Sequence, residues 1–161
     1  MESSLRKILN IFLIVSILSS CRPEDSLVGI ISIPESGWSP DKVLEFRLHQ
    51  KQTGSKVDLL YQLQYDPEFP WENIWLNYQL QTPSGDTLMQ SSGNLYLFQP
   101  GIGKPYGKGC RERLFIDAYF LKGIILKDTG NYRLLVRHQM RTENLKGIQA
   151  IGIRMKKSEG N

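Results

Sequence analysis

Residues 73–81 read Asn-Ile-Trp-Leu-Asn-Tyr-Gln-Leu-Gln, and residues 83–86, Pro-Ser-Gly-Asp, follow after a single threonine. From Ile74 to Leu80 every second side chain is aliphatic or aromatic, and the side chains between them are mostly polar amides. This period of two is typical of a β-strand with one face in a core and the other outside it. Proline and glycine at 83–86 favour a tight turn. The segment therefore predicts a strand that leads into an antiparallel hairpin.

The rest of the chain repeats this design. An apolar run and six alternating segments predict further strands at residues 26–33, 44–49, 59–65, 95–98, 114–119, 132–138 and 151–156. Hairpin turns are predicted at residues 53–55, 91–94 and 128–131, a flexible glycine-rich loop at 100–109, and one or two helical turns at 141–148. Short strands at this spacing predict an all-β fold, a single antiparallel β-sandwich of about eight or nine strands.

The N-terminus predicts a lipoprotein signal. Arg6 and Lys7 precede an apolar stretch at residues 8–18 that is too short to span a membrane, and Leu-Ser-Ser-Cys at 18–21 then has the pattern of a lipobox. The thiol of Cys21 would accept a diacylglyceryl group, small residues before it would admit the peptidase, and the freed amine would take another acyl chain. Two or more chains anchor a protein stably. An ordinary cleaved signal or an uncleaved anchor are the alternatives.

These features divide the chain into four parts: a signal peptide at 1–20, the acylated cysteine and tether at 21–26, the sandwich at 27–157 and a tail at 158–161. Cleavage of 20 of the 161 residues leaves 141, enough for one domain with a real core. The chain would be held at a membrane through Cys21, and we expect the periplasmic face of the outer membrane.

Charge and composition exclude several functions. The net charge of +4 is too mild to indicate nucleic-acid binding. Basic residues gather late in the sequence. The simpler interpretation is that they lie on solvated faces of strands. The alternative is a contact surface for an acidic protein or lipid head groups. They are Arg133, Arg137, Arg141, Lys146, Arg154, Lys156 and Lys157. Two histidines and one cysteine besides Cys21 give no metal-ligand spacing, so no metal and no cofactor are predicted.

Catalysis finds little support. Cys110 lies among basic residues, which could lower the pKa of its thiol, but a small, partly buried side chain is the simpler interpretation. Asp66, Glu68 and Glu72 could form a carboxylate pair or bind calcium, but an acidic loop at one edge of the sandwich is the simpler interpretation. The chain is therefore predicted not to be an enzyme.

Tryptophans mark the best candidate surface. Trp71 and Trp75 lie in a segment rich in aromatic residues, and Trp75 falls on the strand face opposite Leu76. An outward tryptophan could stack on a sugar ring or contact a protein. A second buried face under a neighbouring loop is the alternative. Trp71 and Trp75, together with Arg141 and Lys146, are the residues we expect to contact a partner or a glycan.

Three segments of the sequence hold distinctive motifs. The first is Ile-Pro-Glu-Ser-Gly-Trp-Ser-Pro-Asp at 33–41, with an early Gly-Trp pair. The second runs from Tyr65 to Leu76, with Pro-Ser-Gly-Asp-Thr-Leu at 83–88 after it. The third spans 138–154 and holds the pieces His-x-Met-Arg, Leu-Lys-Gly-Ile and Gly-aliphatic-Arg. Together these segments resemble the GldH family of gliding-motility lipoproteins of the Bacteroidetes. Residues 110–113, Cys-Arg-Glu-Arg, depart from the family pattern.

The resemblance implies a small β-rich lipoprotein, without a transferable active site, in an envelope machinery of gliding that is coupled to protein secretion across the outer membrane. Its partners would be other envelope proteins of that machinery. From the residues alone, a carbohydrate-binding lipoprotein with a stacking platform at Trp71 and Trp75 is the alternative. At the end of the penultimate strand, Gly147 would permit a positive φ while Leu145 and Ile148 pack on the sandwich.

Overall fold

The computed structural model describes residues 25–158. The predicted signal peptide at 1–20, Cys21, the tether up to residue 24 and the last three residues of the tail lie outside this range. Within it, no helix is long and apolar enough to cross a membrane.

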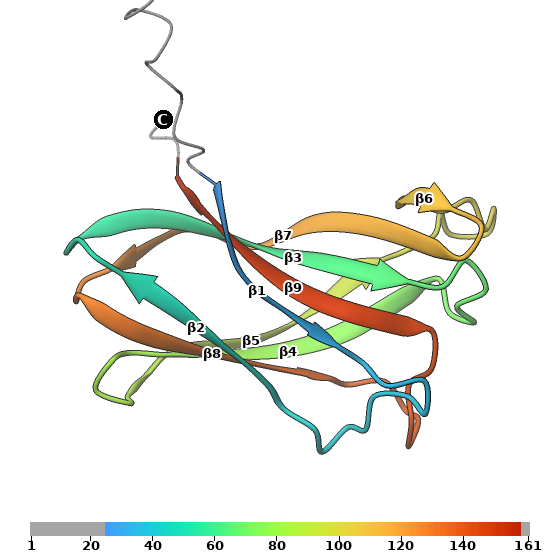
Figure 1. The fold of residues 1–161 in the computed structure, drawn as a ribbon, viewed down its shortest axis with the longest axis horizontal. Helices are drawn as coiled ribbons and strands as arrows, with labels where there is room; N and C mark the ends of the chain where they lie inside the picture. The colour runs from blue at the N-terminus through green and yellow to red at the C-terminus, as the bar shows by residue number, and fades with distance from the viewer. Residues whose placement is uncertain (1–24, 159–161) are drawn as a thin grey trace, which may run out of the picture.

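Nine strands form the described domain, and they stack as two layers (Figure 1). Their bounds are β1 Asp25–Ser32, β2 Leu44–Gln50, β3 Ser55–Tyr65, β4 Asn73–Gln81, β5 Thr87–Tyr96, β6 Lys108–Cys110, β7 Arg113–Leu126, β8 Gly130–His138 and β9 Ile148–Lys157. One sheet has five strands in the order β1-β9-β3-β7-β6, and the other has four in the order β2-β8-β4-β5. Every pair is antiparallel, so the predicted all-β antiparallel sandwich is confirmed.

Alternation explains how the two sheets make one core. In β2 the buried apolar positions are Leu44, Phe46 and Leu48, and they lie directly across from Val136, Leu134 and Tyr132 of β8. Each of these side chains loses nearly all its contact with water, which stabilises the fold by about 1.5–3 kcal/mol for a residue of this size. The outward residues between them stay at least partly solvated, as the sequence pattern predicts.

The predicted turns are only partly right. Residues 83–86 do connect the hairpin of β4 and β5. Residues 53–55 and 128–131 were expected to close hairpins, but each lies between strands of different sheets, so the chain crosses from one layer to the other there. Residues 91–94 were also expected to form a turn, but they lie inside β5, which runs from Thr87 to Tyr96. A local turn signal cannot distinguish a hairpin from a crossing between layers.

β7 contains irregularities that the sequence pattern did not indicate. Its register against β3 shifts on both sides of Leu59, so β7 holds extra residues there. One is Phe120, whose ring stacks on buried Tyr61 with centroids 4.0 Å apart. Farther along, Gly123 takes a φ of 66°, and its N–H donates to Asp58 Oδ1 at 2.6 Å. Such bulges bend a strand and redirect its side chains.

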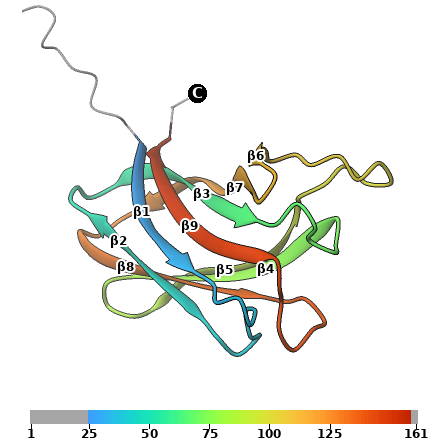
Figure 2. The same ribbon diagram turned by 45° about the vertical axis from the view of Figure 1, so that its right-hand side comes forward.

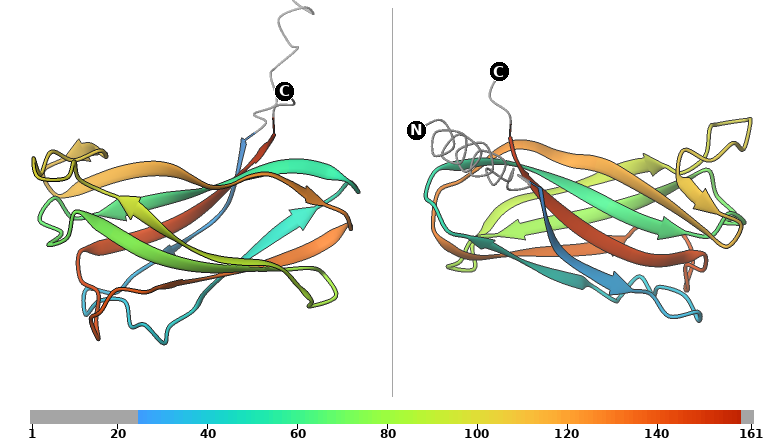
Figure 3. Two further views of the ribbon diagram at one scale, coloured as in Figure 1. Left: turned by 180° about the vertical axis from the view of Figure 1, so that it is seen from behind. Right: turned by 45° about the horizontal axis from the view of Figure 1, so that its top comes forward.

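The two ends of the described chain lie next to each other. Asp25 at the start of β1 is paired with Lys156 near the end of β9, and Figure 2 shows these two strand ends side by side. The opposite end of the sandwich carries the longer loops, including the glycine-rich one before β6 (Figure 3). The fold thus separates an end where the described chain begins and ends from an end that presents the longer loops.

Candidate interaction surface

Trp38 fastens the loops at the end of the sandwich that lies away from the tether. Its ring is fully buried, and Nε1 donates to the carbonyl oxygen of Lys42 at 2.8 Å. Its backbone pairs in both directions with Leu145, at 2.9 Å each way. The helical turns predicted at 141–148 are absent, so that prediction was wrong. The backbone of Leu145 instead forms its hydrogen bonds with Trp38.

His138 completes this arrangement. Its ring lies edge-on to Trp38, with centroids 5.1 Å apart, and is buried. Nε2 is 2.8 Å from the Trp38 carbonyl oxygen, which can only accept, while Nδ1 accepts from the Met140 N–H at 3.3 Å. Only the neutral tautomer with a proton on Nε2 satisfies both contacts. Burial lowers the pKa of His138, although the bond to Trp38 works in the other direction.

A pH dependence of stability follows from His138. Because its pKa is lowered on folding, the unfolded chain binds a proton more readily below about pH 6.5 than the folded one, and stability falls as the pH drops from there toward the folded pKa. One proton allows a slope of at most about 1.4 kcal/mol per pH unit. Urea unfolding between pH 7.5 and 5.0 should show a His138→Gln variant that is less stable at pH 7.5 but approaches the native protein as the pH falls. A constant or widening gap would contradict this assignment.

Trp75 points outward from β4, as its place in the alternation predicts. It is 45% exposed, so the alternative of a second buried face was wrong. Its backbone is fixed on one side by the Gln139 N–H, which donates to its carbonyl oxygen at 2.8 Å, and its own N–H lies 3.4 Å from Met140 Sδ. The indole is therefore an exposed ring on a rigid strand rather than on a mobile loop.

The outer face of the four-stranded sheet around Trp75 is polar. Register places Asn94 of β5 beside Trp75, and Asn77 of β4 beside Arg137 of β8. The Asn77 amide nitrogen donates to the Ser91 carbonyl and the Ser92 hydroxyl at 3.2 and 3.1 Å. Alternation alone predicts that these residues face outward. Their grouping around the tryptophan depends on the strand order β8-β4-β5, which the sequence pattern does not reveal.

Farther along the same face lies a group of charged side chains. Arg133 donates two hydrogen bonds to the carboxylate of Glu45, at 2.9 and 3.2 Å, and Arg47 contacts the same carboxylate at 3.3 Å. The hydrogen bond from Arg133 is the main reason that the pKa of Glu45 is lowered. Arg133 thus belongs to a surface ion pair across β2 and β8, which agrees with the interpretation of solvated strand faces.

Trp71 stands in the loop before β4. It is 38% exposed, and its ring leans on Phe69 with centroids 5.3 Å apart. Phe69 is buried against Gly147, where an added Cβ would come within 3.0 Å of the ring. Gly147 has a φ of 86°, as predicted, and Leu145 and Ile148 are buried. The loops at 66–72 and 139–147 therefore support each other and present Trp71 on their surface.

The four predicted contact residues do not form one patch. Arg141 and Lys146 are both exposed in the loop between β8 and β9. Lys146, however, lines a hollow with Gln64, Arg113 and Ala150 on the outer side of the five-stranded sheet. Trp75 is on the outer face of the other sheet. Lys146 and Trp75 consequently face different sides of the sandwich.

The residues considered for catalysis are scattered. Glu72 accepts a hydrogen bond from the Gly101 N–H at 2.7 Å, and Asp66 accepts one from the Glu68 N–H at 2.8 Å, so both carboxylates organise loops. Cys110 is an exposed free thiol; the expectation that it is partly buried was wrong, because β6 is a short strand at the sheet edge. Across residues 25–158, no three His, Cys, Asp or Glu side chains are grouped so that they could hold a metal ion.

Comparison with known proteins gives one clear match. The family described as GldH lipoprotein matches residues 29–155, nearly the whole described domain. A curated relative, the gliding motility lipoprotein GldH of Flavobacterium johnsoniae, is 24% identical over 131 residues. That alignment covers 77% of this chain and 80% of the relative.

Two solved structures resemble the chain weakly. An arabinose-bound α-L-arabinofuranosidase aligns with a TM-score of 0.40 and 14% identity, over 79% of this chain and 18% of its own. An acetyl xylan esterase from the rumen bacterium Butyrivibrio proteoclasticus gives a TM-score of 0.36 and 9% identity, over 83% of this chain and 31% of its own. Scores this low carry no conclusion about activity.

Proposed function

Because the chain belongs to the GldH lipoprotein family, we propose that it is a membrane-anchored, non-catalytic component of a gliding-motility apparatus and of the secretion associated with it. The observation that carries the proposal is the family match over residues 29–155, which spans the sandwich from β1 to β9. A motility-associated lipoprotein is the role that this match supports directly. The finer parts of the proposal concern attachment, location and contacts.

Attachment would be through lipid on Cys21, after removal of residues 1–20. The lipobox at 18–21 supports this, as does the family's description as a lipoprotein. The outer membrane, on its periplasmic face, is our proposed location. There the sandwich would work by contact with other envelope proteins of the machinery, and Trp71, Trp75, Arg141 and Lys146 are the proposed contact residues.

Trp75 is the strongest of these because it combines exposure with a rigid setting. A tryptophan at the centre of a protein contact commonly contributes 2 kcal/mol or more, or about 30-fold in affinity. We expect Trp75→Ala to reduce colony spreading of the cells severalfold while the variant stays folded and membrane-bound. The measurement is spreading on soft agar, with immunoblots of the membrane fraction to establish equal amounts of protein.

A matched control is available on the other sheet. Phe115 is 46% exposed on the outer face of β7, so Phe115→Ala removes a similar exposed ring from a different surface. The proposal expects normal spreading for this variant. Equal spreading by both variants and the native protein would remove Trp75 from the contact surface.

A carbohydrate-binding function is the second candidate, and the amides around Trp75 are the observation that favours it. Aromatic rings stack on sugar faces while amides bond to hydroxyl groups. On this alternative the lipidated protein in detergent would bind particular glycans on an array, and Trp75→Ala would abolish that binding. Absence of glycan binding by the native protein would leave only the motility proposal.

A further inference from the structure

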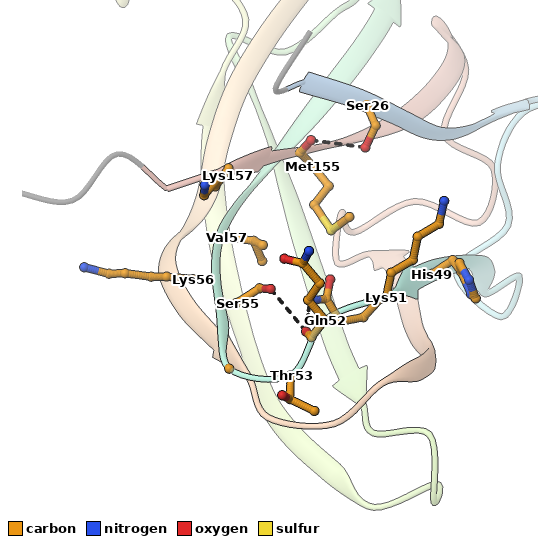
Figure 4. A pocket seen from close by; sticks show the side chains of 12 residues that line it. Ser26, His49, Lys51, Gln52, Thr53, Ser55, Lys56, Val57, Met155 and Lys157 are labelled. Carbon is orange, nitrogen blue, oxygen red and sulfur yellow. Dashed lines mark hydrogen bonds between the residues drawn. The ribbon is translucent and has the colours of Figure 1, made fainter. Parts of the chain in front are cut away.

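Five lysines gather at the end of the sandwich where β1 begins. Two adjoining hollows mark the place. The first is lined by Ser26, Lys51, Lys56 and Lys157 among others. Figure 4 shows that separate segments contribute these side chains and that Lys56 extends outward, away from Lys51. The second is lined by Lys56, Lys122, Lys156 and Lys157. We call Lys51, Lys56, Lys122, Lys156 and Lys157 the lysine cluster.

The fold assembles this cluster from four segments. Lys51 follows the last residue of β2, Lys56 is near the start of β3, and Lys156 and Lys157 end β9. Lys122 is placed by the bulge in β7, where the neighbouring Gly123 lies beneath the Lys56 side chain. Lys122 also holds its ammonium 4.5 Å from the centre of the Tyr119 ring, a favourable cation–π distance.

Positive charge dominates this surface. The two hollows are lined by the five lysines and by one carboxylate, that of Asp58. Asp58 already accepts a hydrogen bond from the Gly123 N–H at 2.6 Å. Residues 22–25 of the tether, Arg-Pro-Glu-Asp, add a single negative charge, which does not offset the excess. Lys51, Lys56, Lys122 and Lys157 are exposed, so their ammonium groups can reach a partner.

The position of the cluster indicates what that partner is. Asp25 pairs with Lys156, and only four residue steps separate Asp25 from Cys21. A fully extended chain covers at most about 14 Å in four steps. An acyl group on Cys21 would therefore hold Asp25, and with it the end of β9 that carries Lys156 and Lys157, within about this distance of a bilayer surface. Clusters of basic residues immediately beside a membrane anchor attract anionic lipid head groups.

We propose that the lysine cluster docks on anionic phospholipid head groups and fixes the orientation of the sandwich on its membrane. This inference rests on the proposed attachment through Cys21. Docking would also explain why the two ends of the sandwich differ. β8 begins beside the cluster, where its residue Gly130 pairs with Gln50, the neighbour of Lys51. It ends at the other end of the sandwich, where His138 pairs with Leu76, the neighbour of Trp75. The docked sandwich therefore holds Trp75 and the loops at the far end away from the bilayer, where another protein can reach them.

Amine labelling of the full-length lipidated protein in vesicles tests the proposal. Vesicles of phosphatidylcholine alone are compared with vesicles that contain one third phosphatidylglycerol, and the rate of reductive methylation is measured at each lysine by mass spectrometry. We expect the lysine cluster to react severalfold more slowly in the anionic vesicles. Lys42, Lys104 and Lys108, exposed in segments away from the cluster, should react equally in both. Half-molar salt should remove the difference, since it shortens the screening length to a few ångströms.

Two matched triple variants separate docking from mere proximity to a charged surface. In K56Q/K122Q/K157Q, the remaining Lys51 and Lys156 should lose most of their protection. In K42Q/K104Q/K108Q, which removes the same charge elsewhere, the cluster should stay protected. Equal changes in both variants, or no protection of the native protein, would overturn the proposal. Failure of Cys21 attachment would look different, because the protein would then not float with vesicles of phosphatidylcholine alone.

Discussion

Replacing Trp38 by alanine is expected to lower the free energy of unfolding by about 4 kcal/mol, a value typical of replacing a buried tryptophan or phenylalanine by alanine. The indole is fully buried, packs edge-on against His138 and donates a hydrogen bond to Lys42. Alanine would leave a cavity and an unpaired carbonyl where the loop between β1 and β2 meets the loop between β8 and β9. For a domain of this size that loss is a large share of the total stability.

Urea unfolding followed by circular dichroism measures this effect. Trp71→Ala is the matched control, because the same side chain is removed from a position that is 38% exposed. We expect a loss of about 1 kcal/mol or less for the control, since surface substitutions have small effects. A loss below about 1 kcal/mol for Trp38→Ala would mean that the Gly-Trp segment does not hold the loops together.

Replacing Cys21 by alanine should abolish lipid attachment altogether. Without the thiol no thioether forms, so no label from a fatty-acid analogue should enter the protein. The measurement is metabolic labelling followed by immunoprecipitation. Cys110→Ala is the control, because Cys110 is the other cysteine of the chain and is exposed. Label that persists in Cys21→Ala, or that disappears in Cys110→Ala, would show that the anchor was assigned to the wrong residue.

Much of the sandwich could be predicted from local sequence. Segments such as 44–49 and 132–138 alternate strictly because each buries one face against the opposite sheet, and both are strands in the structure. The partners of these strands could not be predicted. The turns at 53–55 and 128–131 have the composition of hairpins, yet their strands separate into different sheets. That choice depends on packing between layers, which no short segment encodes.

Segment 141–148 shows another limit of local prediction. Its composition suggested a helical turn, but Leu145 pairs with Trp38, a residue more than a hundred positions earlier. A bridge of this kind overrides weak local preference, because it satisfies backbone groups that would otherwise be buried without partners. The two residues belong to separate segments that resemble the family. In the structure they pair with each other and join two loops.

The candidate surfaces could also be predicted only in part. The outward position of Trp75 follows from alternation alone and is confirmed. The separation of Lys146 from Trp75 does not follow, because it depends on which sheet each neighbouring loop covers. The lysine cluster was equally hidden. Its members lie between positions 51 and 157, and only the pairing of β9 with β1 and β3, together with the bulge in β7, brings them together.

Surface spreading by cells whose only copy of the protein lacks the anchor tests the central claim most directly. In that copy, residues 1–21 are replaced by an ordinary cleaved signal peptide, so that the sandwich is exported without lipid. If the protein is a membrane-anchored part of the motility apparatus, these cells should fail to spread, and cells with the native copy should spread normally. Full spreading with the unanchored sandwich, present in equal amount, would contradict the account.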